Sequence, residues 1–260
     1  MRLKVKIGEQ QLILENPYYG LLQGAIYSGL SAPLFEKVHN KGFRSVVKPC
    51  KVFRFFSFSP LFGKERFTIK QNGVCKIKGN VHFFISSLIP EFIEDLKDNL
   101  ETKGLKLGGV ILPVKCKVME FPFKNIEGEK KAIAILKVHN LFVAKWTGHW
   151  KETSHRHQEF DFWSFEFDRA IIDSLNEKIK TAFAYGLVKP FEPLLVIRGK
   201  NLIKEAFFPL RKNQVVFKTY TCELLVESNM STLQFIYAIG LGAKTSHGLG
   251  FTEIKGLMQI

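Results

Sequence analysis

Apolar and polar residues alternate at the start of the chain, and the spacing becomes helical shortly afterwards. The alternation covers residues 3–7 and a short apolar run follows at 12–14, so a hairpin or a broken strand is predicted there. Asn16 and Pro17 suit the N-cap and the first position of a helix. One helical face then follows at Leu22, Ile26 and Leu30.

The next elements complete a first structural unit. A short helix is predicted at 34–39, which Gly42 terminates. The density of β-branched and aromatic residues predicts strands at 52–58 and 74–86. A helical stripe follows at 89–100, and a closing strand is predicted at 110–121. The order strand, helix, strand, strand, helix, strand is typical of the ferredoxin-like fold.

A polar and charged segment at 122–131 separates this unit from a second one with the same order. The second unit has its predicted strands and helices at 133–143, 171–186, 194–197, 215–226, 233–240 and 251–254. The sequence therefore predicts an α+β protein of two tandem ferredoxin-like (βαββαβ, RRM-like) domains, 1–123 and 124–260, with a C-terminal glycine-rich loop.

That loop, residues 240–250, contains two G-x-G pairs around a polar centre and directly follows a predicted helix. Glycines allow backbone amides to approach phosphate oxygens closely. A dinucleotide-binding fingerprint requires the opposite order, strand before helix, and the Walker A spacing is missing. A flexible hairpin is the alternative. The candidate RNA-binding residues of the loop are Gly240, Gly242, Lys244, Thr245, Ser246, His247, Gly248 and Gly250.

The charge of the chain favours a polyanionic partner. Lysine and arginine number 38 against 24 acidic residues, a net charge of +14. Residues 41–80 hold ten basic residues and one acid, Glu65, and Arg44 and Lys48 within this window are candidate phosphate contacts. The alternative is that these basic residues are solvated faces of strands.

Other features of the sequence exclude several classes of protein. No apolar stretch is long enough to span a bilayer, so a soluble, cytoplasmic protein without membrane contact is expected. The four cysteines are widely spaced, which favours neither zinc nor disulfides. The acidic residues form no nuclease metal site, so no cofactor or metal is expected.

Four segments together resemble the RAMP superfamily, and more narrowly the CRISPR-associated repeat-processing endoribonucleases of the Cas six family. These segments are 21–27, 34–43, 53–63 and 240–251. The resemblance implies an endoribonuclease that cuts precursor CRISPR repeat RNA without a metal, through the 2′-hydroxyl, leaving 2′,3′-cyclic phosphate and 5′-hydroxyl ends. Other CRISPR effector subunits and a homodimer are compatible with it. The alternatives are a non-catalytic RAMP subunit that holds guide RNA and a general RNA-binding module.

The resemblance also implies a catalytic site. His39 matches the catalytic histidine of the family, and histidine suits proton transfer near neutral pH. A histidine that merely caps a helix end is the alternative. Tyr27 matches the active-site tyrosine, or is a core aromatic. Arg54 lies approximately where the family often has a lysine that stabilises the phosphorane, and this is a departure from the pattern; Lys51 is the other candidate for that role.

A cluster of histidines and tryptophans follows the first predicted strand of the second unit. It contains His149, His155, His157, Trp146 and Trp150. The irregular spacing and the lack of nearby cysteines argue against zinc. The aromatic rings suit base stacking in an RNA-binding loop.

Overall fold

The computed structural model describes the chain except for residues 9–10, 16–17, 70–73, 124–129, 147–156 and 210–215. The predicted helix cap at Asn16 and Pro17 therefore lies outside the described residues, as do His149, Trp150 and His155. The side chains of Trp146 and His157 are also not described.

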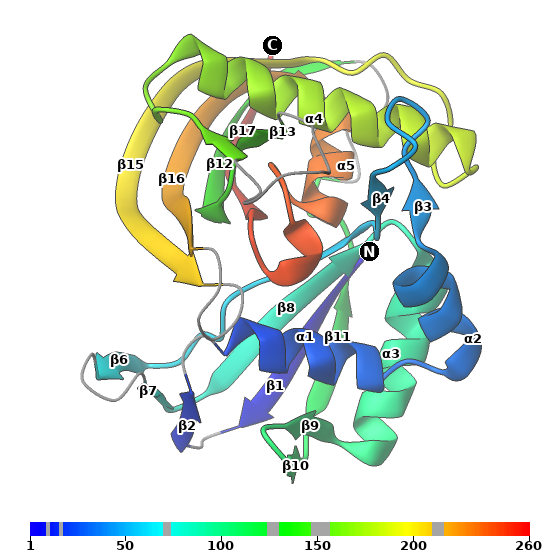
Figure 1. Cartoon of the computed structure of the whole chain (residues 1–260), viewed down its shortest axis with the longest axis vertical. Helices are drawn as coiled ribbons and strands as arrows, with labels where there is room; N and C mark the ends of the chain where they lie inside the picture. Colours follow the sequence, from blue (N-terminus) through cyan, green and yellow to red (C-terminus); the bar gives the residue numbers. More distant parts are fainter. Residues whose placement is uncertain (9–10, 16–17, 70–73, 124–129, 147–156, 210–215) are drawn as a thin grey trace, which may run out of the picture.

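The first half of the chain forms a four-stranded antiparallel sheet. Its order is β11 (Lys115–Met119), β1 (Arg2–Gly8), β8 (Val81–Ser87) and β5 (Phe56–Phe58). The alternate residues Leu3, Val5, Phe83 and Ile85 are fully buried on the face covered by helix α3 (Pro90–Lys103). Helix α1 (Tyr19–Ser28) lies beside α3 (Figure 1).

The second half repeats this architecture with longer strands. The sheet order is β15 (Leu195–Pro209), β16 (Val216–Asn229), β12 (Lys131–Leu141) and β17 (Phe251–Gln259). The alternate residues Ala132, Ala134, Leu136 and Val138 of β12 are fully buried. The helices of this half are α4 (Phe165–Ala184), which runs along the top of Figure 1, and α5 (Met230–Ile239). Asn229 caps α5 by accepting from the Thr232 amide at 2.9 Å.

Both halves therefore have the order strand, helix, strand, strand, helix, strand. In each sheet the fourth main strand pairs with the first, the first with the third, and the third with the second. The prediction of two ferredoxin-like units is confirmed. The domain limits 1–123 and 124–260 stay a prediction, since residues 124–129 are outside the described part of the chain.

Several short strands and helices lie outside the two four-stranded sheets. They are the three-stranded sheet of β2 (Gln11–Glu15), β7 (Val74–Lys78) and β6 (Glu65–Ile69), and the pairs β9 (Leu105–Leu107) with β10 (Val110–Leu112), β13 (Ala144–Trp146) with β14 (His157–Glu159), and β3 (Phe43–Arg44) with β4 (Val52–Phe53). Helix α2 (Ala32–Phe35) continues into a π-helix, η1 (Glu36–Lys41), and a 3₁₀ turn, η2 (Thr245–His247), lies inside the glycine-rich segment.

Several predicted strand limits are wrong. The strand expected at 52–58 breaks into β4 and β5 because Phe55 has a positive φ of 46°. The strand expected at 74–86 is interrupted at Gly79 and Asn80, both with positive φ. The one expected at 110–121 consists of β10 and the separate β11, and the one expected at 194–197 extends to Pro209.

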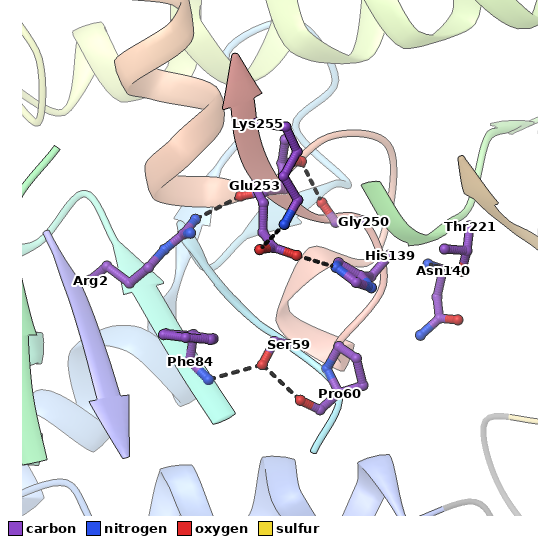
Figure 2. Close-up of polar contacts among 11 residues, drawn as sticks. Arg2, Ser59, Pro60, Phe84, His139, Asn140, Thr221, Gly250, Glu253 and Lys255 are labelled. Atoms are coloured by element: carbon purple, nitrogen blue, oxygen red, sulfur yellow. Dashed lines mark hydrogen bonds and ion pairs between the residues drawn. The ribbon is translucent and has the colours of Figure 1, made fainter. Parts of the chain in front are cut away.

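A buried arginine joins the two sheets. Arg2 of β1 donates to the Ser86 hydroxyl at 2.6 Å and to the carbonyls of Tyr237 and Thr252 at 2.8 and 2.7 Å. Its guanidinium also stacks on the rings of Tyr237 and Phe251. Figure 2 shows Arg2 pointing from the first sheet toward β17. The two halves are thus held in contact through charged hydrogen bonds as well as apolar packing.

Candidate active site

Tyr27 and His39 come together from two consecutive helices. Their ring centroids are 4.5 Å apart in an edge-to-face arrangement, and His39 also stacks on Phe35 with centroids 4.6 Å apart. Tyr27 is buried, whereas His39 is half-buried and reachable from solvent. The imidazole therefore lies at the surface, with one face fixed by aromatic rings.

The π-helix η1 sets the tautomer of His39. Asn40 donates its amide NH₂ to Glu36, so its amide oxygen faces His39 Nδ1 at 2.8 Å. A proton on Nδ1 satisfies that contact and leaves Nε2 as an acceptor. Such π-turns are rare and frequently occur at functional sites. The predicted short helix is thus confirmed in position, and Gly42 ends it.

The Tyr27 hydroxyl keeps its proton and can donate a hydrogen bond. Burial raises the pKa of Tyr27 to about 12, against the nearby Arg54 charge, which lowers it. The hydroxyl is therefore protonated at neutral pH. It has no hydrogen-bond partner of good geometry among the described residues. The side chains of Arg54 and Gln23 nevertheless lie close enough to this hydroxyl to lower its pKa, so its surroundings are partly polar.

Arg54 belongs to this cluster, whereas Lys51 does not. Arg54 donates from its guanidinium to the His39 carbonyl at 3.1 Å. Lys51 instead forms an ion pair with Glu177 of α4 at 2.8 Å. Burial opposes ionisation of Glu177, but hydrogen bonds from Lys51 and Ser45 lower its pKa overall. Of the two cations predicted to stabilise developing negative charge, Arg54 is the one bonded to the His39 backbone and close to the Tyr27 phenol.

The neighbouring residue, Lys178, was missed from the sequence. It is buried and donates to the Gly242 carbonyl at 2.5 Å. Burial lowers the pKa of Lys178 to about 7, and the Lys51 charge acts in the same direction. A cue was present, because Lys178 falls within the apolar stripe formed by Ile171, Leu175, Ile179 and Ala182, where a lysine has to find an internal partner.

The segment 240–250 is packed between the two halves. Gly240, Gly242, Thr245, Ser246, Gly248 and Gly250 are buried, and Lys244 and His247 are half-buried. Gly248 has a φ of 82°, and a Cβ there would lie 2.5 Å from the Tyr19 ring. Gly250 has a φ of 74°, and a Cβ there would lie 1.8 Å from the Leu241 carbonyl oxygen. These glycines are explained by close packing.

Three of the glycine amides expected to contact phosphate already have partners within the chain. The amides of Gly240, Gly248 and Gly250 donate to the carbonyls of Ile236, Thr245 and His139. The segment is nevertheless tied to the cluster, because Gln23 of α1 donates to the Ser246 carbonyl at 2.7 Å. Gln23 lies one helical turn before Tyr27. An RNA-binding role for the loop residues stays a prediction.

A second polar group, also missed from the sequence, lies between the two sheets (Figure 2). His139 Nε2 is 2.6 Å from Glu253, and Lys255 contacts the same carboxylate at 2.8 Å. Burial alone raises the pKa of Glu253, but the hydrogen bonds from His139 and Lys255 lower it to about 2. His139 lies beside Phe251, with ring centroids 6.2 Å apart, and the Glu253 charge acts on Arg2, so the pair contributes to the junction of the two halves.

Two other described histidines, His82 and His247, do not join the cluster. His82 lies in β8, beside Phe62 and Phe84. His247 lies in η2 next to Ser246. In the part of the chain that the structure describes, no three His, Cys, Asp or Glu side chains are grouped so that they could hold a metal ion. No described helix is both long and apolar enough to cross a membrane.

The side chains of Tyr27, His39 and Arg54 together can support proton transfer and stabilise negative charge. The half-exposed imidazole of His39 lies against the buried ring of Tyr27, and the Arg54 guanidinium is bonded to the His39 carbonyl. They provide a general base, a hydrogen-bond donor and a fixed positive charge, which together suit a reaction that moves a proton and develops negative charge.

Comparison with known proteins agrees with this fold. Residues 142–254 match the family model described as CRISPR associated protein Cas6, C-terminal. The chain is 26% identical over 229 residues to the CRISPR-associated endoribonuclease Cas6 1 of Methanocaldococcus jannaschii. That match covers 85% of this chain and 82% of the relative.

Solved structures share the whole fold. A CRISPR associated protein Cas6 superposes with a TM-score of 0.69 at 21% identity, covering 98% of this chain and 99% of the other. A Cas6-related protein from Pyrococcus furiosus gives a TM-score of 0.68 at 17% identity, with 98% of both chains covered. A RAMP protein described as binding different RNA substrates gives 0.66 at 15% identity, covering 98% and 100%. The chain is thus similar in sequence to a Cas6 endoribonuclease, has the fold of the solved Cas6 structures, and matches the Cas6 C-terminal family model at residues 142–254.

Proposed function

We propose that this chain binds CRISPR repeat RNA and cleaves the precursor transcript at the cluster of Tyr27, His39 and Arg54. The observation that carries the proposal is the meeting of these three side chains from three separate segments. The similarity to a curated Cas6 endoribonuclease supports the substrate. Glycine-loop residues 240–250, with Arg44 and Lys48, supply the predicted RNA contacts.

The reaction that fits this cluster is transesterification. The 2′-hydroxyl of the scissile nucleotide attacks the adjacent phosphorus while His39 Nε2 accepts its proton. The bond to the 5′-oxygen then breaks, and that oxygen takes up a proton, for which Tyr27 is the donor candidate. Arg54 stabilises the negative charge of the phosphorane. The products are a 2′,3′-cyclic phosphate and a 5′-hydroxyl, and no step uses a metal.

The proposal is tested with purified protein and a labelled repeat RNA. We expect shorter RNA in the presence of EDTA, ends of the stated chemistry, and no product from an RNA with a 2′-deoxyribose at the scissile nucleotide. A shifted band without shorter RNA would instead identify a non-catalytic RAMP subunit that holds guide RNA. Cleavage of the deoxyribose substrate would contradict the mechanism.

The ion pair of Lys51 with Glu177 favours Arg54 as the charge-stabilising residue. Arg54→Ala should lower the single-turnover cleavage rate by about 10²-fold, the usual loss for one donor to a developing anion. Lys51→Ala should lower it much less, because Lys51 is paired with Glu177. Single-turnover rates at saturating protein measure both. A larger loss for Lys51→Ala than for Arg54→Ala would reverse the assignment.

A further inference from the structure

The β3–β4 hairpin and the end of α4 form an exposed surface that the cluster does not use. Val46 and Val47 of the hairpin are 53% and 51% exposed, and Tyr185, which follows α4, is 46% exposed. Arg44 and Lys48 are exposed beside them. We call Arg44, Val46, Val47, Lys48 and Tyr185 the hairpin patch. Large apolar side chains exposed together with cations suggest a binding surface.

The patch is held in place by α4. The Ser45 hydroxyl donates to Glu177 at 2.6 Å, and the Val46 amide donates to the Thr181 hydroxyl at 3.4 Å. The Arg44 amide donates to the Tyr185 hydroxyl at 3.2 Å. Figure 1 shows the hairpin rising from the first half to meet α4. The surface is therefore ordered before any partner binds, which lowers the entropic cost of binding.

The Tyr185 ring has a defined orientation. Its edge contacts Phe43 at a centroid distance of 5.3 Å and an interplanar angle of 89°. That contact and the hydrogen bond from Arg44 fix both ends of the side chain. Because the side chain is nearly half exposed, part of the ring remains available as a flat apolar surface.

The charge around the ring favours an anionic partner. Residues 41–64 contain six basic residues and no acid. Arg44 and Lys48 form no ion pair within the described part of the chain. The nearby acid, Glu177, is buried and already accepts from Ser45 and Lys51. A flat ring flanked by unpaired cations is the arrangement that binds single-stranded nucleic acid.

The patch is continuous with the cluster. The hairpin begins directly after η1, which carries His39, and its second strand leads to Arg54. Phe43 pairs with Phe53 across the hairpin. We propose that the hairpin patch binds single-stranded nucleotides flanking the scissile bond, with Tyr185 stacking on a base and Arg44 and Lys48 contacting phosphates. This inference rests on the proposed function and deepens it.

The test compares Tyr185→Leu, which removes the ring, with Tyr185→Phe, which keeps it. Affinities are measured by fluorescence anisotropy with repeat RNA made uncleavable by a 2′-deoxyribose, and with versions trimmed on the 5′ or the 3′ side of the scissile bond. Loss of base stacking costs roughly 1–3 kcal/mol, so Tyr185→Leu should weaken binding of the full RNA by about 5- to 150-fold. Tyr185→Phe should bind as the wild type does. On the RNA trimmed of the contacted nucleotides, all three proteins should bind equally.

Three outcomes would overturn the inference. If the Leu variant binds the full RNA as tightly as the wild type does, base stacking on Tyr185 is excluded. Equal losses in the Leu and Phe variants assign the effect to the hydroxyl and its contact with Arg44. Unchanged RNA affinity with a change in mass on gel filtration identifies the patch as a protein contact. Cleavage of ribose RNA by the wild type tests the proposed function separately, since a protein that binds without cutting can still show the Tyr185 effect.

Discussion

Replacing His39 with alanine should slow cleavage of repeat RNA by about 10²- to 10⁴-fold, the usual contribution of a positioned proton-transfer group. RNA affinity should change little, because the imidazole acts on a proton and the binding charges lie elsewhere. Single-turnover cleavage at saturating protein gives the rate, and anisotropy with a 2′-deoxyribose substrate gives the affinity. Because His39 is only half-buried, its replacement should change the stability of the protein little.

His82→Ala is the matched control for His39→Ala. His82 is also half-buried, lies beside aromatic rings, and has its Nδ1 2.9 Å from a backbone carbonyl, that of Asn80. It differs in lying on β8 without contact to Tyr27 or Arg54. We expect this variant to cleave at close to the wild-type rate. Equal losses in the two variants, or cleavage by His39→Ala at the original rate, would remove His39 from the mechanism.

Periodicity predicts the framework of this fold well because most of its elements bury one face. The stripe of α3 and the alternation of β1 both reflect residues with almost no exposure. The breaks within strands were not predictable in the same way. Phe55 adopts a positive φ although nothing in its residue type favours it, because the chain there has to pass from the hairpin into the sheet.

The candidate site was predicted only in part, for a related reason. The positions of Tyr27, His39 and Arg54 followed from resemblance, but which cation lies beside the imidazole depends on tertiary contacts. Lys51 and Arg54 are equivalent in charge, and only the position of Glu177 in α4 separates them. No local pattern links residue 51 with residue 177. The orientation of His39 by Asn40 likewise depends on the π-turn, which no local sequence pattern indicates.

The glycine-rich segment was interpreted from sequence as a phosphate cradle, whereas packing explains its glycines directly. Gly250 combines a left-handed backbone with a Cβ position 1.8 Å from the Leu241 carbonyl oxygen. Leu241 in turn donates its amide to the Gly250 carbonyl at 2.8 Å, so the two backbones cannot separate without losing that bond. Gly250→Ala should therefore destabilise the protein by about 3–5 kcal/mol, combining backbone strain with overpacking.

Gly108→Ala separates these two contributions. Gly108 also has a positive φ, 60°, but a Cβ there meets no atom within 4 Å. It should thus show only the backbone cost, about 1–2 kcal/mol. In thermal unfolding we expect Gly250→Ala to lower the Tm by on the order of 10 °C and Gly108→Ala by a few degrees. If both variants lose the same amount, the left-handed backbone alone accounts for Gly250. If Gly250→Ala retains full stability but loses RNA affinity, the glycine is needed for RNA contact and not for packing at the junction of the two halves.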